Sequence, residues 1–257
     1  MSDEPKPKSH GRLSISANAQ PRDLMAQVVK NAWVARVITL FPDAFPGVLA
    51  ASLTGRALDL GLWRLETVDL RSFGEGRHRT VDDSPAGGGA GMVLRADVVD
   101  AALMAAAGLP VCYLSPRGRR FDQAMARDWA AGPGVTLLCG RFEGVDQRVL
   151  DHHGVDEVSL GDFVLTGGEI AAQAMLDATV RLLPGVLGNA ASVEEESFSA
   201  GLLEHPQYTR PVVWQGLEIP AVLQSGHHGE IARWRQAEAE RVTQERRPDL
   251  WERYKAR

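Results

Sequence analysis

The sequence predicts an α/β protein in which a parallel sheet is flanked by helices on both faces. Two observations lead to this prediction. Between residues 33 and 182, short apolar runs typical of buried strands alternate with segments of helical spacing. Such alternation is typical of parallel sheets, whose strands are joined by helical crossovers. The chain has 257 residues, enough to bury a large core without disulfides or structural metals.

The first strand is predicted at W-V-A-R-V-I-T-L-F and ends at Phe41-Pro42. Residues 43–59 have the spacing of a helix, and residues 62–70 have the pattern of a second strand. A stretch of about twenty residues without periodicity, 71–92, follows, and loops of this length within a compact domain are usually functional or disordered.

Strands and helices then alternate. Helices are predicted at residues 96–107, 123–131, 146–152 and 168–182, and strands at 111–114, 135–139 and 155–160. Periodicity lapses between residues 184 and 211, and the end of the chain is helical and rich in arginine. We therefore divide the chain into a flexible N-terminal extension (1–31), an α/β domain (32–184), a linker or active-site loop (185–211) and a helical C-terminal domain (212–257).

Composition limits the class of protein. The net charge of −5 argues against a uniformly basic nucleic-acid surface, although it allows local basic patches. No run of about 18 apolar residues is present, and the N-terminus has no signal-like apolar segment, so we expect a soluble, cytoplasmic protein with no membrane partner. Cys112 and Cys139 lie in apolar runs, which favours buried thiols over a disulfide or a metal pair.

Three glycine-containing segments each follow a predicted strand: S-P-R-G (115–118), G-R-F-E-G (140–144) and G-D-F-V-L-T-G-G-E (161–169). In open parallel sheets, ligands bind beyond the carboxyl ends of the strands, so the three segments should converge on one pocket. Glycine there would let the backbone touch the ligand. The alternative is that each segment is a tight turn with glycine at a helix end.

Several common sites are excluded. The chain has no Walker phosphate loop, no dinucleotide-binding fingerprint and no G-x-S-x-G nucleophile elbow. Two cysteines are too few for a Cys/His zinc cluster. The adjacent pairs His152/His153 and His227/His228 should point in different directions, so solvated or capping histidines are expected.

Seven motifs in order along the chain resemble the bacterial tRNA (guanine-N1)-methyltransferases, a family of the knotted SPOUT class. They are V-D-D-S-P-A-G-G-G-A-G-M, Y-L-S-P-R-G, C-G-R-F-E-G-V-D-Q-R-V, S-L-G-D-F-V-L-T-G-G-E, L-P-G-V-L-G-N, S-F-x-x-G-L-L-E-H-P-Q-Y-T-R-P and L-x-S-G-H-H-x-E-I-x-x-W-R. The resemblance runs from about Trp33 to the C-terminus. It implies a deep C-terminal trefoil knot, S-adenosylmethionine as methyl donor, and methylation of guanosine at tRNA position 37.

The resemblance also implies the cofactor-binding residues and the form of the assembly. The matching positions are Tyr113, Leu114, Ser115, Pro116, Gly118, Gly140, Arg141, Leu160, Gly161, Asp162, Phe163, Val164, Leu165, Gly167 and Gly168. The family implies a homodimer in which each site takes cofactor loops from one chain and a linker carboxylate from the other.

Methylation of guanine N1 requires a base for the N1 proton and a positive donor at O6, where negative charge develops. The family base is an aspartate two residues before the Phe of an S-F pair, and the matching residue is Glu196, one methylene longer, with Glu195 as the alternative. Arg181 matches the arginine placed near O6, and Glu143 matches an acid linked to Mg²⁺ dependence. Read from the residues alone, Arg181 would only complement a helix C-terminus.

The tRNA anticodon stem-loop is the implied partner. Residues expected to contact it are Arg77, His78, Arg79, Asp82 and Asp83 in the long loop, Arg210 after the linker, and Arg233, Trp234, Arg235 and Arg241 near the C-terminus. Arginines near phosphates supply affinity, but the same C-terminal residues fit an ordinary amphipathic helix. The rival functions are SPOUT methylation of another RNA position, a non-catalytic RNA-binding protein with this fold, and an α/β metabolic enzyme.

Overall fold

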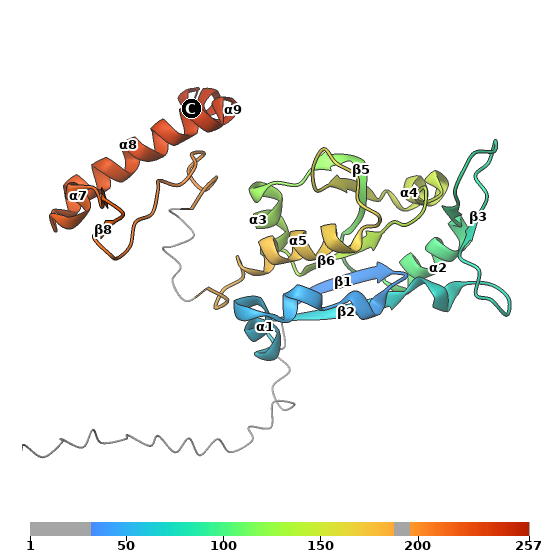
Figure 1. The fold of residues 1–257 in the computed structure, drawn as a ribbon. Coiled ribbons are helices and arrows are strands. Elements are labelled where there is room, and N and C mark those ends of the chain that lie inside the picture. Colours follow the sequence, from blue (N-terminus) through green and yellow to red (C-terminus); the bar gives the residue numbers. More distant parts are fainter. Residues whose placement is uncertain (1–31, 188–195, 257) are drawn as a thin grey trace, which may run out of the picture.

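The computed structural model describes residues 32–187 and 196–256, and its main element is a five-stranded parallel sheet with strand order β2-β1-β6-β5-β7 (Figure 1). The strands are β1 (Trp33–Thr39), β2 (Trp63–Asp69), β5 (Val111–Arg120), β6 (Gly134–Cys139) and β7 (Asp156–Ser159). Every pairing in this sheet is parallel. The predicted fold class is therefore confirmed.

Helices cover both faces of the sheet, because alternate strand residues point to opposite sides. In β1, Ala35 and Val37 belong to one buried cluster, whereas Ile38 belongs to the other. The first cluster includes residues of α1 (Ser52–Asp59), α3 (Gln123–Ala131) and α5 (Glu169–Val180). The second includes residues of α2 (Ala96–Ala105) and α4 (Gln147–His153).

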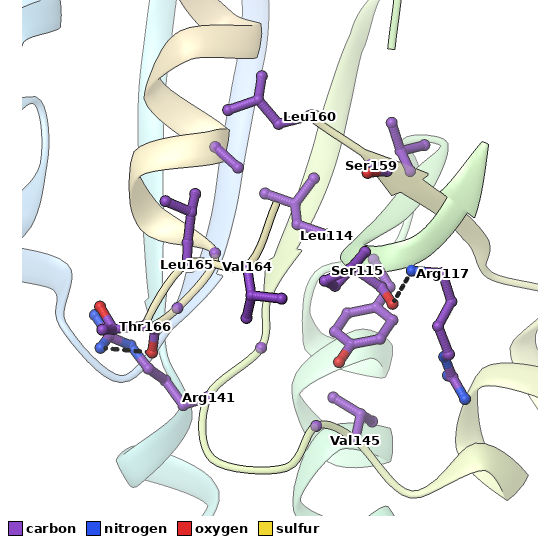
Figure 2. Close-up of a pocket in the computed structure, with 18 of the residues that line it drawn as sticks. Leu114, Ser115, Arg117, Arg141, Val145, Ser159, Leu160, Val164, Leu165 and Thr166 are labelled. Carbon is purple, nitrogen blue, oxygen red and sulfur yellow. Dashed lines mark hydrogen bonds between the residues drawn. The ribbon is translucent and has the colours of Figure 1, made fainter. Parts of the chain in front are cut away.

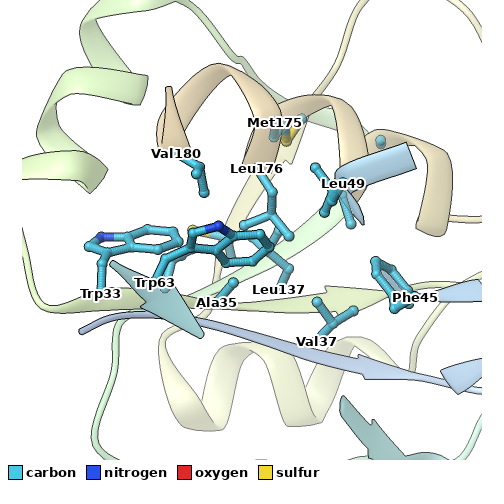
Figure 3. Packing of buried hydrophobic residues seen from close by; sticks show 14 of the residues in the cluster. Trp33, Ala35, Val37, Phe45, Leu49, Trp63, Leu137, Met175, Leu176 and Val180 are labelled. Atoms are coloured by element: carbon cyan, nitrogen blue, oxygen red, sulfur yellow. The ribbon is translucent and has the colours of Figure 1, made fainter. Parts of the chain in front are cut away.

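The first cluster is built around two tryptophans, as Figure 3 shows. Trp63 is fully buried and its indole N–H donates to the Thr54 carbonyl at 3.0 Å. Trp33 lies beside it and donates to the Trp129 carbonyl at 2.9 Å. Both rings bury large apolar areas while their polar atoms remain paired, which anchors β1 and β2 under α5.

Two sequence expectations in this domain were wrong. Residues 43–59 form two 3₁₀ turns, Pro42–Ala44 and Gly47–Ala50, followed by α1, in place of one helix. Pro46 has no N–H to continue a helix, and Gly47 has φ of +56°. Strand β5 also continues past Leu114, with a register shift before Arg119.

The long segment 71–92 contains a 3₁₀ turn (Leu70–Phe73) and β3 (Asp82–Asp83), which pairs antiparallel with β4 (Val93–Leu94). The C-terminal part holds α7 (Ala221–Gln224), α8 (His228–Arg246) and α9 (Pro248–Lys255), and lies to one side of the sheet (Figure 1). None of the helices in the described part of the chain could cross a membrane.

The predicted C-terminal domain (212–257) begins with a hairpin, before the helix that was expected from residue 227. Strands β8 (Val213–Trp214) and β9 (Leu217–Glu218) pair antiparallel across Gln215-Gly216. Both turn residues have positive φ, of 50° and 79°, which is the geometry of a tight two-residue hairpin turn. The predicted extension 1–31 lies outside the described residues.

Candidate active site

A cavity of about 360 Å³ lies beside the irregular part of β5 between Leu114 and Arg119 and beyond the carboxyl ends of β6 and β7, and the three glycine-containing segments meet there as predicted (Figure 2). Its volume is in the range of small-molecule sites. The predicted residues that line it are Tyr113, Leu114, Ser115, Pro116, Gly140, Arg141, Leu160, Gly161, Phe163, Val164, Leu165, Gly167 and Gly168. Apolar side chains and backbone polar groups form most of this wall, which suits a ligand with a heteroaromatic ring.

Two predicted residues lie outside the cavity wall. A Cβ on Gly118 would lie 2.3 Å from the backbone of Glu157 and Val158, so this glycine allows β5 and β7 to approach. Asp162 is mostly exposed and pairs with Arg120 at 3.0 Å.

The sequence analysis also missed part of the wall. The additional lining residues are Arg117, Phe142, Gly144, Val145, Val158, Ser159, Thr166 and Ala171. Half of them lie within the three predicted segments, so including every residue of each segment would have found them. The others lie within a few residues of a segment, and extending each motif would have found these.

The glycines of the cavity wall make room for neighbouring protein groups, in addition to the backbone contact with a ligand that the sequence predicts. A Cβ on Gly140 would lie 2.8 Å from the Tyr113 ring, and one on Gly161 would lie 2.7 Å from the Phe163 ring. At Gly168 the added atom would be 2.8 Å from the Cys139 backbone, and the Gly168 N–H donates to the Gly140 carbonyl at 3.1 Å. Glycine is therefore needed where two chain segments cross.

Tyr113 forms part of the cavity floor and is almost fully buried. Burial raises the pKa of its hydroxyl above the ordinary value, so the group stays a neutral donor or acceptor at physiological pH. Glu143 lines the cavity and is the only carboxylate among the described lining residues. One carboxylate is a small donor set for Mg²⁺, which then depends on water for its other ligands.

The predicted base and the predicted O6 donor bind each other. Arg181, directly after α5, donates from Nη1 and Nη2 to Oε2 and Oε1 of Glu196, at 2.7 and 2.5 Å. This hydrogen-bonded pair lowers the pKa of Glu196 and raises that of Arg181. Neither residue lines the cavity of its own chain. The alternative base, Glu195, lies outside the described residues.

The residues predicted to contact RNA lie on separate segments, and none of them lines the cavity. Arg77 and Arg79 are exposed on a turn closed by the Glu75–Thr80 bridge. Asp82 and Asp83 form β3, where Asp83 accepts from the Ser84 N–H at 2.7 Å.

The C-terminal candidates differ in their surroundings. Arg210 and Arg233 are exposed, and Trp234 is half-buried with its ring 6.1 Å from the Tyr208 ring. Arg241 pairs with Glu238 and Glu245 on the same helix, which neutralises much of its charge toward phosphate.

One histidine departs from its expected solvated state. Nε2 of His153 lies 2.6 Å from Oδ1 of Asp100, and this contact joins α4 to α2. His152 is close enough for the three side chains to approach one metal ion. The hydrogen bond between His153 and Asp100 is a contact between the two helices.

Comparison with known proteins gives one consistent result. The profile of the tRNA (guanine-1)-methyltransferase family, TrmD, matches residues 34–253. A tRNA (guanine-N(1)-)-methyltransferase of Cereibacter sphaeroides (strain KD131) is 72% identical over 235 residues, covering 88% of this chain and 94% of its own. Proteins of the same name from Ruegeria sp. (strain TM1040) and Rhodospirillum rubrum are 69% and 61% identical, covering 88% and 86% of this chain and 94% and 93% of theirs.

Proposed function

Because the chain belongs to the tRNA (guanine-1)-methyltransferase family, we propose that it transfers the methyl group of S-adenosylmethionine to N1 of guanine 37 in tRNA. The observation that carries this proposal is the cavity beside the irregular part of β5 and beyond the carboxyl ends of β6 and β7. Family membership names a reaction, and the cavity supplies a place of suitable size and polarity for the methyl donor. Because a tRNA-modifying enzyme works where tRNA is used, a cytoplasmic location is part of this proposal.

The lining residues fit the proposed cofactor. Leu114, Leu160 and Leu165 would supply apolar surface for the adenine, and the backbone groups of residues 140, 160, 161 and 163–165 would supply hydrogen-bond partners. When bound, S-adenosylmethionine supplies an electrophilic methyl group on a positively charged sulfur. We also propose that Glu143 would hold Mg²⁺, with water supplying most of the other ligands of the ion.

The crossing at Gly168 and Cys139 supports the proposed trefoil knot. A Cβ on Gly168 would lie 2.8 Å from the Cα of Cys139 and 3.2 Å from the Gly140 nitrogen, so the two backbones run against each other with no space for a side chain at this position. Such contact is expected where one segment is drawn through the loop made by another, a topology that is very rare among proteins.

The Arg181–Glu196 pair suggests how the substrate controls the base. While Arg181 binds Glu196, the lowered pKa makes this carboxylate a weaker proton acceptor. If the O6 atom of a bound guanine accepted the hydrogen bonds of the Arg181 guanidinium, Glu196 would be released and the pKa of Glu196 would rise again. Arg181 would then stabilise the charge that develops on O6 while Glu196 removes the N1 proton.

The proposed active site needs a second copy of the chain. Neither Arg181 nor Glu196 lines the cavity of its own chain, so a partner's carboxylate would serve it. Large apolar side chains are exposed beside the cavity loops: Phe41, Val48 and Ile170 are 44%, 68% and 61% exposed. Exposed apolar groups on neighbouring segments are typical of protein interfaces.

Mixing two inactive variants tests the shared site. Glu196→Gln removes the base, and Gly140→Val drives a side chain into the Tyr113 ring and disrupts the cavity. In random heterodimers of a twofold-symmetric enzyme, one of the two sites keeps both parts, so about a quarter of wild-type activity should return. Mixtures that stay as inactive as the separate variants would contradict the shared site.

The remaining contacts proposed for tRNA are Arg77, Arg79, Asp82, Asp83, Arg210, Arg233 and Trp234. The direct test of the function is transfer of a labelled methyl group into an anticodon stem-loop with guanosine at position 37, beside a matched stem-loop with adenosine there. Mass analysis should find 1-methylguanosine in the first RNA and no methylation in the second. A 2′-O-methyl product would indicate a different RNA position, and failure of the protein to bind S-adenosylmethionine in calorimetry would favour a non-catalytic RNA-binding protein.

A further inference from the structure

Glu169 is a buried carboxylate next to the cavity that the proposed mechanism does not use. It is the first residue of α5 and is only 4% exposed. Its Oε1 accepts a hydrogen bond of 2.7 Å from the hydroxyl of Thr39 at the end of β1. Its Oε2 lies 2.8 Å from Nη2 of Arg141, although the two groups are not aligned for a hydrogen bond. A buried charge requires such partners, because removal from water is costly.

Arg141 connects this carboxylate to the cavity wall. Its guanidinium donates to the Thr166 carbonyl at 3.2 Å and lies over the Phe41 ring, 4.4 Å from the ring centroid (Figure 2). The arginine lines the cavity, whereas Glu169 does not. Any effect of Glu169 on a ligand must therefore act through another residue.

Gly167 makes this arrangement possible. A Cβ at this position would lie 2.2 Å from Nε of Arg141, so any side chain would displace the guanidinium. Each residue of the string T-G-G-E (166–169) therefore has its own structural role at or near Arg141. Thr166 supplies a carbonyl acceptor, Gly167 leaves space, Gly168 allows the backbone crossing, and Glu169 supplies the opposite charge.

We propose that Glu169 is a positioning residue that holds Arg141 against the cavity wall and so keeps the segments 140–144 and 161–168 at the spacing that the methyl donor requires. The inference rests on the proposed function, because S-adenosylmethionine is the ligand whose binding it supports. Three segments distant in sequence meet at this one carboxylate: the end of β1, the loop after β6 and the start of α5. A shift of one of them would change the shape of the cavity.

The main test is Glu169→Gln, which keeps the size of the side chain and an acceptor for Thr39 but removes the charge facing Arg141. We expect calorimetry to show S-adenosylmethionine binding weakened on the order of tenfold to hundredfold, the change that corresponds to the loss of one hydrogen bond to a charged group. At saturating cofactor the rate should fall much less, and the affinity for the RNA stem-loop should not change. A purely structural pair would lower Tm without changing the affinity of the folded protein.

The matched control is Glu66→Gln. Glu66 forms a comparable partly buried pair with Arg36, 2.8 Å apart, in the same sheet but away from the cavity. Its loss should change Tm without changing cofactor affinity. If folded Glu169→Gln binds the cofactor as tightly as Glu66→Gln does, the positioning role is wrong. If the wild-type protein itself does not bind S-adenosylmethionine, the proposed function fails first.

Thr39→Val gives a second test if the glutamine variant does not fold. It removes the hydroxyl donor from the other side of Glu169 while keeping the Arg141 ion pair, and should weaken cofactor binding by a smaller factor. Unchanged affinity in folded Thr39→Val would overturn the proposal. A double-mutant cycle with Arg141→Met adds a sharper criterion, because residues that act through one another are not additive. In the Arg141→Met background, Glu169→Gln should cause little further loss, and full additivity would contradict the inference.

Discussion

Glu196→Gln should reduce methyl transfer by about 10²–10⁴-fold, the usual contribution of a positioned base. The substitution keeps the shape of the side chain but cannot accept the N1 proton. Cofactor binding should be unaffected, because Glu196 does not line the cavity of its own chain and its proposed partner in the shared site is the guanine N1 proton and not the methyl donor. Single-turnover transfer into the stem-loop measures the chemical step, and calorimetry measures the cofactor affinity.

Glu238→Gln is the matched control for this variant. Glu238 forms a similar pair with Arg241, 2.7 Å apart, on the exposed face of α8. Its removal should leave the single-turnover rate unchanged. If Glu196→Gln stays active while Glu195→Gln is inactive, the base is Glu195.

Arg181→Lys should lower the single-turnover rate by about 10²–10³-fold, the typical cost of losing one donor to a developing oxyanion. The lysine keeps the positive charge but loses the planar fork that binds Glu196 through two hydrogen bonds. A lysine variant with full activity would rule out the proposed contact with O6.

The same variant should change the pH dependence in a defined direction. Arg181 holds the pKa of Glu196 below its ordinary value, which is about 4.3 for a free glutamate. The pair therefore stabilises the folded protein above that pH, and this contribution is lost as the pH falls through the lowered pKa. In Arg181→Lys the pKa of Glu196 in the free enzyme should rise, and the acid limb of the kcat/KM profile, which reports the free enzyme, should move to higher pH.

The sequence predicted the elements whose pattern is local. The strand starting at Trp33 and the helix Gln123–Ala131 follow directly from apolar runs and helical spacing, and both were found. The helix expected over residues 43–59 was wrong because Pro46 and Gly47 interrupt it, a local signal that the apolar spacing concealed. Convergence of the three glycine-containing segments was also predictable, since parallel strands end at one edge of the sheet.

The environment of each glycine and of Glu169 could not be predicted in the same way. The atoms that exclude a Cβ from Gly140, Gly161 and Gly168 belong to other residues of the cavity, and only the folded chain brings them into contact. In the sequence, Glu169 resembles an acid that favours the start of a helix. Its hydroxyl partner is 130 residues earlier, a distance over which the sequence pattern carries no information.

The bond between Thr39 and Glu169 also bears on the synthesis of this protein. Thr39 is synthesised 130 residues before Glu169, the residue that accepts its hydrogen bond. Contacts of such long range form late in folding because a long loop must close first. A nascent chain that ends before residue 169 already contains β1 and most of the sheet. It lacks Glu169, however, so the contacts of this residue with Thr39 and Arg141 cannot form. The unfinished polypeptide is therefore expected to bind S-adenosylmethionine weakly until Glu169, about two thirds of the way along the 257 residues, has been added and folded into place.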